Sequence, residues 1–185
     1  GGRSISRWEI VRAAEPQALF AGRYVIAHRP AGNARVSTYF LGGTAHLSDR
    51  YLSAARRHLQ FFEDLHGDYL FPKFAVVENF FPTGYGFPSF TLLGTRVLQL
   101  PFIPETSLKH EIAHCWWGNG VLVDYKTGNW CEGLTTYVSE HLSKERESEQ
   151  TARVYRVRAL TDYALLAAGE ADFPLAAFRS RNSPA

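Results

Sequence analysis

The pattern of hydrophobic and polar residues predicts mostly short strands up to about residue 100 and mostly helices after it. Turn-forming residues at 30–33 separate the first two predicted strands, which indicates a strand–loop–strand unit. Residues 79–90 are rich in Gly, Pro and aromatic side chains and are predicted to form a loop. The segments predicted to be strands are residues 24–27, 36–41, 74–77, 91–93 and 97–100.

Apolar residues that recur every three or four positions predict four helices. The first covers residues 48–66, where Ser48 or Asp49 can cap the N-terminus and Gly67 can end the helix. The other three are predicted at about residues 106–117, 129–144 and 147–168. Because strands precede helices instead of alternating with them, the sequence predicts an α+β fold with a mixed sheet.

Composition narrows the class of protein. The 185 residues are 45% hydrophobic and 21% charged, which is typical of a globular chain that can bury a core. A net charge of +2 without a basic run argues against a nucleic-acid partner. No apolar run approaches the length of a transmembrane helix, so we expect no membrane segment in this piece. Composition does not indicate a compartment.

The strongest chemical signal is the H-E-x-x-H sequence at residues 110–114. Residues i and i+4 share one face of a helix, so His110 and His114 can bind one Zn²⁺ together. Glu111 can then reach the water-bearing position of the metal and act as general base. The alternative is a polar, exposed helix face that binds no metal.

A catalytic zinc needs a third protein ligand, and Glu132 at the start of the next predicted helix is the main candidate. Asp124 in the connection and Glu140 two turns further along are weaker candidates. Cys115 follows His114 by one position, and Cys131 precedes Glu132 by one position. A side chain one position away on a helix points about 100° away, so we interpret both thiols as packing residues.

Residues 110–119 resemble the zinc-binding helix of the M1 aminopeptidases, the gluzincin group that also contains leukotriene A4 hydrolase. The shared features are H-E-x-x-H, an aromatic pair and then Gly-Asn. The family's third ligand is a Glu on the next helix, followed by Gly and, five residues after the Glu, by Tyr. Glu132, Gly133 and Tyr137 match that pattern, and the resemblance extends over roughly residues 20–150.

The chain departs from this family in three ways. His114 and Glu132 are separated by 17 residues, where the family usually has 18. The family's substrate-binding G-x-M-E-N segment, whose Glu holds the free α-amine, corresponds to residues 86–90, which contain no acidic residue. The family's transition-state Tyr, in a Y-x-K-G context, has no counterpart before Ala185. The substrate-binding residues that the resemblance implies are Gly84, Tyr85, Gly86, Phe87, Pro88 and Ser89.

The resemblance implies a thermolysin-like zincin core that binds one Zn²⁺ and hydrolyses peptide bonds through a zinc-bound water, with Glu111 as general base. It divides the chain into an N-terminal segment, 1–22, and a partial catalytic domain, 23–185. The implied partners are a peptide substrate and the remainder of a longer parent chain, so we expect low activity or none from this piece alone. Thr136, one turn after Glu132, is predicted to orient a ligand imidazole.

Two alternatives to a peptidase remain open from the sequence. The chain could be a non-catalytic M1-like module that uses the fold for protein–protein contact, although a scaffold has no need of Glu111. It could also be a metallohydrolase that acts on non-peptide substrates, because zinc chemistry does not depend on the acyl group.

Overall fold

The computed structural model describes residues 18–82, 84–166 and 172–179, together with residues 5, 7 and 9. The predicted segment 1–22 and the end of the last predicted helix therefore lie largely outside the described residues. The strands are β1 (Val25–Ala31), β2 (Ala34–Phe40), β3 (Lys73–Asn79), β4 (Gly84–Phe87) and β5 (Phe90–Gly94).

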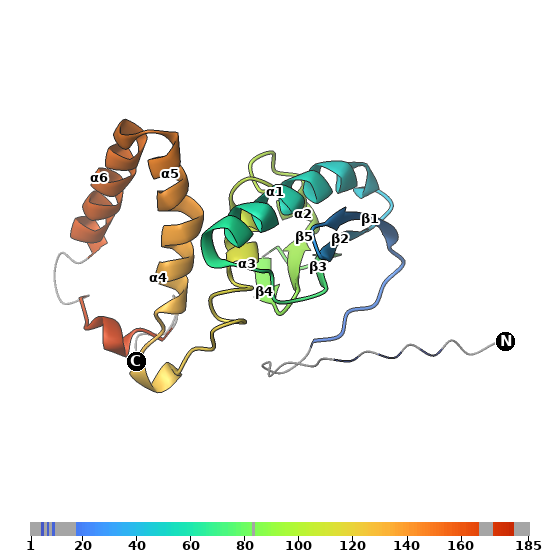
Figure 1. Ribbon diagram of the computed structural model, residues 1–185, viewed down its shortest axis with the longest axis horizontal. Helices are drawn as coiled ribbons and strands as arrows, with labels where there is room; N and C mark the ends of the chain where they lie inside the picture. Colours follow the sequence, from blue (N-terminus) through green and yellow to red (C-terminus); the bar gives the residue numbers. More distant parts are fainter. Residues whose placement is uncertain are drawn as a thin grey trace.

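Helices occupy most of the second half (Figure 1). The α-helices are α1 (Ser48–His66), α2 (Thr95–Leu98), α3 (Ser107–Ala113), α4 (Cys131–Thr136), α5 (Leu142–Glu147) and α6 (Glu149–Leu166). A π-helical stretch, η3 (Tyr137–His141), joins α4 to α5. Short 3₁₀ turns are η1 (Ala45–Leu47), η2 (Tyr125–Thr127) and η4 (Leu175–Ala177). This order confirms the predicted α+β class.

One mixed sheet contains the five strands in the order β1-β2-β3-β5-β4. β1 and β2 are the two strands of the predicted strand–loop–strand unit, and they pair as an antiparallel hairpin whose turn contains Gly32 in the left-handed region, with φ +56°. β2, β3 and β5 run parallel, and β4 closes the sheet as an antiparallel edge strand. β4 is therefore the edge strand that lies next to α3.

The core lies between the sheet and α1, which crosses one face of the sheet (Figure 1). The predicted periodicity of α1 is confirmed, because Leu52, Ala55, Leu59 and Phe62 are all buried. Their partners on the sheet are the inward-facing side chains of β2, β3 and β5, including Val36, Phe40, Phe74, Val76 and Leu93. Gly67 ends the helix with φ +87°, as predicted, and its amide donates to the Glu63 carbonyl.

Two predictions about residues 79–100 are wrong. Residues 84–87 form strand β4 instead of a loop. Successive residues of a strand face opposite sides of the sheet, so Gly84 and Gly86 lie on one face and Tyr85 and Phe87 on the other. Residues 97–100 do not form a strand, since the chain turns into α2 directly after β5. The turn is stabilised by the Thr95 hydroxyl, which donates to the buried Glu78 carboxylate at 2.7 Å.

The predicted helix at 106–117 is shorter in the structure. α3 ends at Ala113, and a tighter turn follows in which the Cys115 amide donates to the Ile112 carbonyl at 2.9 Å. The predicted helix at 129–144 corresponds to the run from α4 through η3 to α5. α6 packs beside α5, with Ala152 buried and Tyr155 donating to Glu140 at 3.0 Å (Figure 1).

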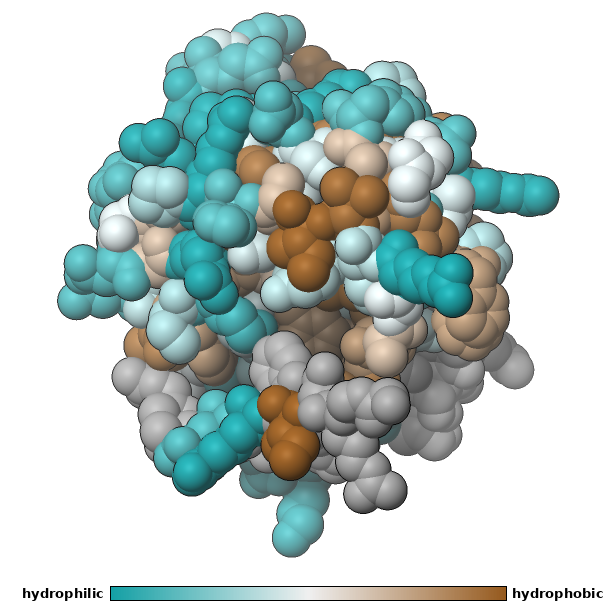
Figure 2. Space-filling model, turned by 90° about the vertical axis from the view of Figure 1, so that its right-hand side faces the viewer, coloured by the Kyte–Doolittle hydropathy of each residue, from teal (hydrophilic) through white to brown (hydrophobic). Residues whose placement is uncertain are grey.

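Hydrophobic side chains form a small group on the face drawn in Figure 2, surrounded by hydrophilic ones. β1 is an edge strand, and its Val25 and Ile26 are about half exposed, at 48% and 57%. No helix among the described residues is both long and apolar enough to cross a bilayer.

The buried imidazole of His58 makes the stability of the fold depend on pH. Its Nε2 donates to the Pro104 carbonyl at 2.8 Å, and burial lowers its pKa from 6.5 to about 4. Between these two values the unfolded chain binds more protons than the native protein, so acid favours unfolding. We expect the free energy of unfolding to fall by about 3 kcal/mol between pH 7 and pH 4 through this group.

Urea unfolding at several pH values measures this effect. In His58→Gln, whose side-chain amide can still donate to Pro104, we expect a weaker loss of stability between pH 6.5 and pH 4 than in the native chain. Identical pH profiles for the two proteins would contradict the assignment.

Candidate metal centre

The buried face of α3 sets the position of the two candidate histidines. Leu108, Ile112 and Ala113 are fully buried against α1 and the sheet. The same helix therefore presents His110 and His114 on its other side, towards β4 and α4. Their Nε2 atoms lie 3.2 Å apart, which brings two donor nitrogens to one point.

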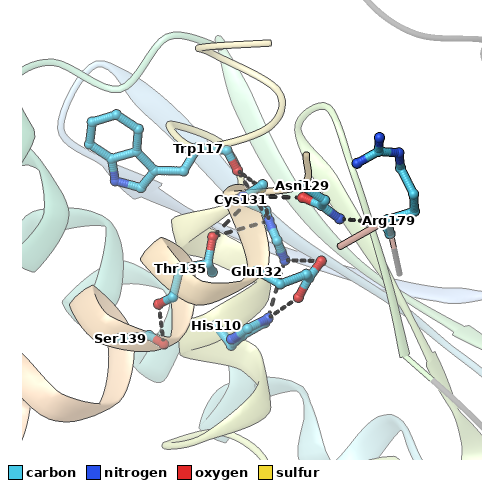
Figure 3. Close-up of polar contacts among 9 residues, drawn as sticks. His110, Trp117, Asn129, Cys131, Glu132, Thr135, Ser139 and Arg179 are labelled. Atoms are coloured by element: carbon cyan, nitrogen blue, oxygen red, sulfur yellow. Dashed lines mark hydrogen bonds and ion pairs between the residues drawn. The ribbon is translucent and has the colours of Figure 1, made fainter. Parts of the chain in front are cut away.

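Glu132, in the first turn of α4, joins the two imidazoles (Figure 3). One carboxylate oxygen lies 3.4 Å from His110 Nε2, and the other lies 3.6 Å from His114 Nε2. Zinc–ligand distances of about 2.0–2.1 Å in tetrahedral geometry place ligand atoms about 3.3 Å apart. The donor set of two imidazoles and a carboxylate therefore fits a zinc ion in both chemistry and spacing.

The other acidic candidates lie in different environments. Asp124 accepts a hydrogen bond from the Lys126 amide at 3.1 Å, and Glu140 accepts one from Tyr155. Within the described part of the chain, the cluster that could hold a metal consists of His110, His114 and Glu132.

The second nitrogen of His114 is held by three neighbours. Nδ1 lies 3.1 Å from the Trp117 carbonyl oxygen, 3.3 Å from the Thr135 hydroxyl and 3.4 Å from Cys131 Sγ. A proton on Nδ1 that is donated to the carbonyl leaves the lone pair of Nε2 for a metal. Thr135 thus occupies the place that the sequence assigned to Thr136.

Cys131 also corrects a prediction, because its thiol contacts a candidate ligand instead of facing elsewhere. Its Sγ donates to the Trp117 carbonyl at 3.0 Å. The first turn of α4 packs under the turn after α3, so adjacent residues of α4 both face the centre. Cys115 is fully buried in the core, as predicted.

Trp117 connects the centre to α1. Its indole Nε1 donates to His66 Nε2 at 3.2 Å, and the two rings meet edge to face. Burial lowers the pKa of His66, which favours the neutral imidazole as acceptor. Sequence reasoning missed this role, since the group that contacts His114 is a main-chain carbonyl, which every residue carries.

Glu111 lies beneath two glycines of β4. A Cβ on Gly86 would come within 2.6 Å of a Glu111 carboxylate oxygen, and one on Gly84 within 3.6 Å of the other. Burial raises the pKa of Glu111 to about 7; the Glu132 charge adds to the increase and His110 opposes it. A carboxylate with a pKa near neutrality is suited to taking up and returning a proton.

A pocket of about 360 Å³ opens over these residues. Of the predicted substrate-binding residues, Gly84, Tyr85 and Gly86 line it. Phe87 instead stacks on Phe90 at 4.7 Å on the other face of the sheet. Pro88 and Ser89 form the turn between β4 and β5, where Ser89 has φ +68°. None of these three residues lines the pocket.

The pocket wall also includes Asn119, Tyr125 and Asn129, which sequence reasoning did not single out. Asn119 lies within the segment that resembles the M1 family, and that context could have identified it. Tyr125 and Asn129 lie in the irregular connection before α4, where no periodic pattern indicates a direction.

Solved structures of similar fold include M1 zinc metallopeptidases and leukotriene A4 hydrolase. The M1 zinc metallopeptidase from Deinococcus radiodurans is 22% identical with a TM-score of 0.62, over 87% of this chain and 36% of its own. Leukotriene A4 hydrolase from Saccharomyces cerevisiae is 18% identical with a TM-score of 0.59, over 80% and 24%. A two-domain M1 zinc metallopeptidase variant bound to L-arginine is 20% identical with a TM-score of 0.55, over 80% and 33%.

These likenesses show the fold, a mixed sheet followed by helices as in the M1 zinc metallopeptidases. The chain spans between about a quarter and a little over a third of the length of these neighbours. No protein-family model matches the chain, and comparison with curated proteins found no similar sequence.

The turn that carries the Trp117 carbonyl depends on Gly118, which has φ +108°. A Cβ there would lie 2.8 Å from Cys131 Sγ. We expect Gly118→Ala to lower the free energy of unfolding by about 1–3 kcal/mol, as measured in urea, because of backbone strain and the thiol contact.

Gly133→Ala is the matched control, since a Cβ at this helical position meets nothing within 4 Å. Its stability should stay the same or rise by up to about 1 kcal/mol. Equal losses in both variants would show that Gly118 is not under special constraint.

Proposed function

We propose that the chain is the zinc-binding part of an M1-like metallopeptidase, in which His110, His114 and Glu132 hold one Zn²⁺. The observation that supports this most is the spacing of the three donor groups, 3.2–3.6 Å apart, with the partly buried Glu111 beside them. A polar helix face without a metal would not require a third donor to converge on the imidazoles.

Zinc at this position supplies a Lewis acid that polarises a carbonyl and acidifies water. Glu111 transfers the proton: its carboxylate receives a proton from the water and delivers it to the leaving amine. The Gly84 and Gly86 backbone leaves room for this carboxylate under β4.

An extended peptide is the substrate that this geometry favours. β4 is the edge strand of the sheet and lines the pocket, and an edge strand can pair with an extended chain through its backbone. In this proposal, Gly84, Tyr85 and Gly86 align the peptide so that one of its carbonyls lies at the centre. Phe87 packs on Phe90 on the other face of the sheet, and Pro88 and Ser89 form the turn that follows β4.

Metal analysis of purified protein tests the centre. We expect one zinc per native chain, and a zinc affinity at least about 100-fold lower in Glu132→Ala, since one of three protein ligands is lost. Glu111→Gln should bind zinc within about threefold of the native chain, because Glu111 is not a ligand. Full zinc occupancy in Glu132→Ala would overturn the proposed ligand set.

Hydrolysis is tested on the parent protein, because the chain spans a minor part of its structural neighbours. We expect peptide cleavage by the parent, loss of at least about 100-fold in kcat for Glu111→Gln, and little or no cleavage by the 185-residue chain alone. Zinc binding without any hydrolysis by the parent would instead favour the non-catalytic interaction module.

A further inference from the structure

The third proposed ligand lies in the first turn of α4, where the helical run of α4, η3 and α5 begins. The preceding connection, residues 118–130, consists of turns and the short η2, so regular structure does not hold Glu132 from that side. Residues 172–179, here called the C-terminal strap, lie against the end of this connection, although the residues in contact are about 50 positions apart in the chain.

Asn129 is the residue that joins the strap to α4, through its main-chain amide and both polar atoms of its side chain (Figure 3). Its amide donates to the Phe178 carbonyl at 2.7 Å, and its Nδ2 donates to the Arg179 carbonyl at 3.0 Å. Its Oδ1 accepts from the Cys131 amide, the first of α4, at 3.1 Å. Asn129 is 92% buried, and it thus links the strap to the helix that carries Glu132: its main-chain amide and its side chain each bind one strap carbonyl.

Gly128 lets the strap approach this closely. Its φ is +103°, and a Cβ would come within 2.9 Å of the Leu175 carbonyl oxygen and 3.0 Å of Ala176. At the other end of the strap, Asp172 accepts a hydrogen bond from Tyr163 of α6 at 2.8 Å. The strap therefore runs from α6 back to the metal centre and is attached at both ends.

We propose that Asn129 is a positioning residue for Glu132, and that the C-terminal strap acts through it to raise the affinity of the centre for zinc. The inference rests on the proposed zinc site. A ligand side chain that is held in place before the metal arrives loses less conformational freedom on binding, so preorganisation raises the affinity for the metal.

Zinc affinity, measured by competition with a chromophoric chelator, tests this inference. We expect Asn129→Ala to bind zinc at least about tenfold more weakly, as does a chain that ends at residue 171. Asn129→Asp keeps an oxygen acceptor for the Cys131 amide but loses the donor to Arg179. It should fall between the native chain and Asn129→Ala.

Asn119→Ala is the matched control, because Asn119 lines the same pocket but, among the described residues, its side chain has no hydrogen bond to α4 or the strap. It should bind zinc within about twofold of the native chain. The absorption spectrum of bound Co²⁺ gives a second readout. It should change in Asn129→Ala, where Glu132 is held less firmly, and stay as in the native chain in Asn119→Ala.

Native affinity in both Asn129→Ala and the shortened chain would overturn the proposal. A lower unfolding temperature of zinc-free Asn129→Ala with native zinc affinity would also overturn it, since the residue would then be merely structural. If Asn129→Ala does not fold, zinc affinity is measured for Asn129→Asp and the shortened chain instead, and native affinity in both would overturn the proposal. A native chain that binds no zinc would refute the proposed function itself, which distinguishes the two failures.

Discussion

The burial of one face of α3 is the constraint on which the rest of the site depends. Leu108, Ile112 and Ala113 have no exposed surface. Burying a side chain the size of Leu or Ile contributes about 1.5–3 kcal/mol of stability. That burial fixes the rotation of α3 about its axis. Because imidazoles at i and i+4 follow the same rotation, His110 and His114 have only one direction in which to point.

The groups around the imidazoles then orient them for binding a metal. Trp117 contributes through both of its ends, its carbonyl beside His114 Nδ1 and its indole on His66 of α1. The first long helix therefore helps to orient a side chain almost fifty residues later in the sequence. Orienting groups of this kind matter because a ligand that rotates freely binds metal more weakly than one that is held.

Metal binding and substrate contact draw on different parts of the chain. The three proposed ligands come from α3, from His114 directly at its C-terminal end and from α4, whereas the wall of the pocket also requires the edge strand β4. The glycines of β4 couple the two parts, because any larger side chain at Gly86 would displace the Glu111 carboxylate. Space for the proposed general base is thus set by the sheet and not by the helix that carries it.

The sequence alone determined those features that arise from nearest neighbours along the chain. The first hairpin, α1 with its Gly67 end and the i, i+4 histidine pair could be predicted because hydrogen bonding and side-chain direction within one element follow its local period. β4 was missed because its glycines resemble a loop, and α2 because a bond from Thr95 to the distant Glu78 redirects the chain. Local patterns carry no information about such contacts.

Tertiary structure decided which side chains meet. It placed Thr135 instead of Thr136 beside His114, turned Cys131 towards the centre and brought residues 172–179 against Asn129. It also moved Phe87 out of the pocket, although its neighbours Tyr85 and Gly86 line it. Each outcome depends on how two elements pack, and packing is determined by the shape and burial of the whole core, which a residue's neighbours in sequence do not specify.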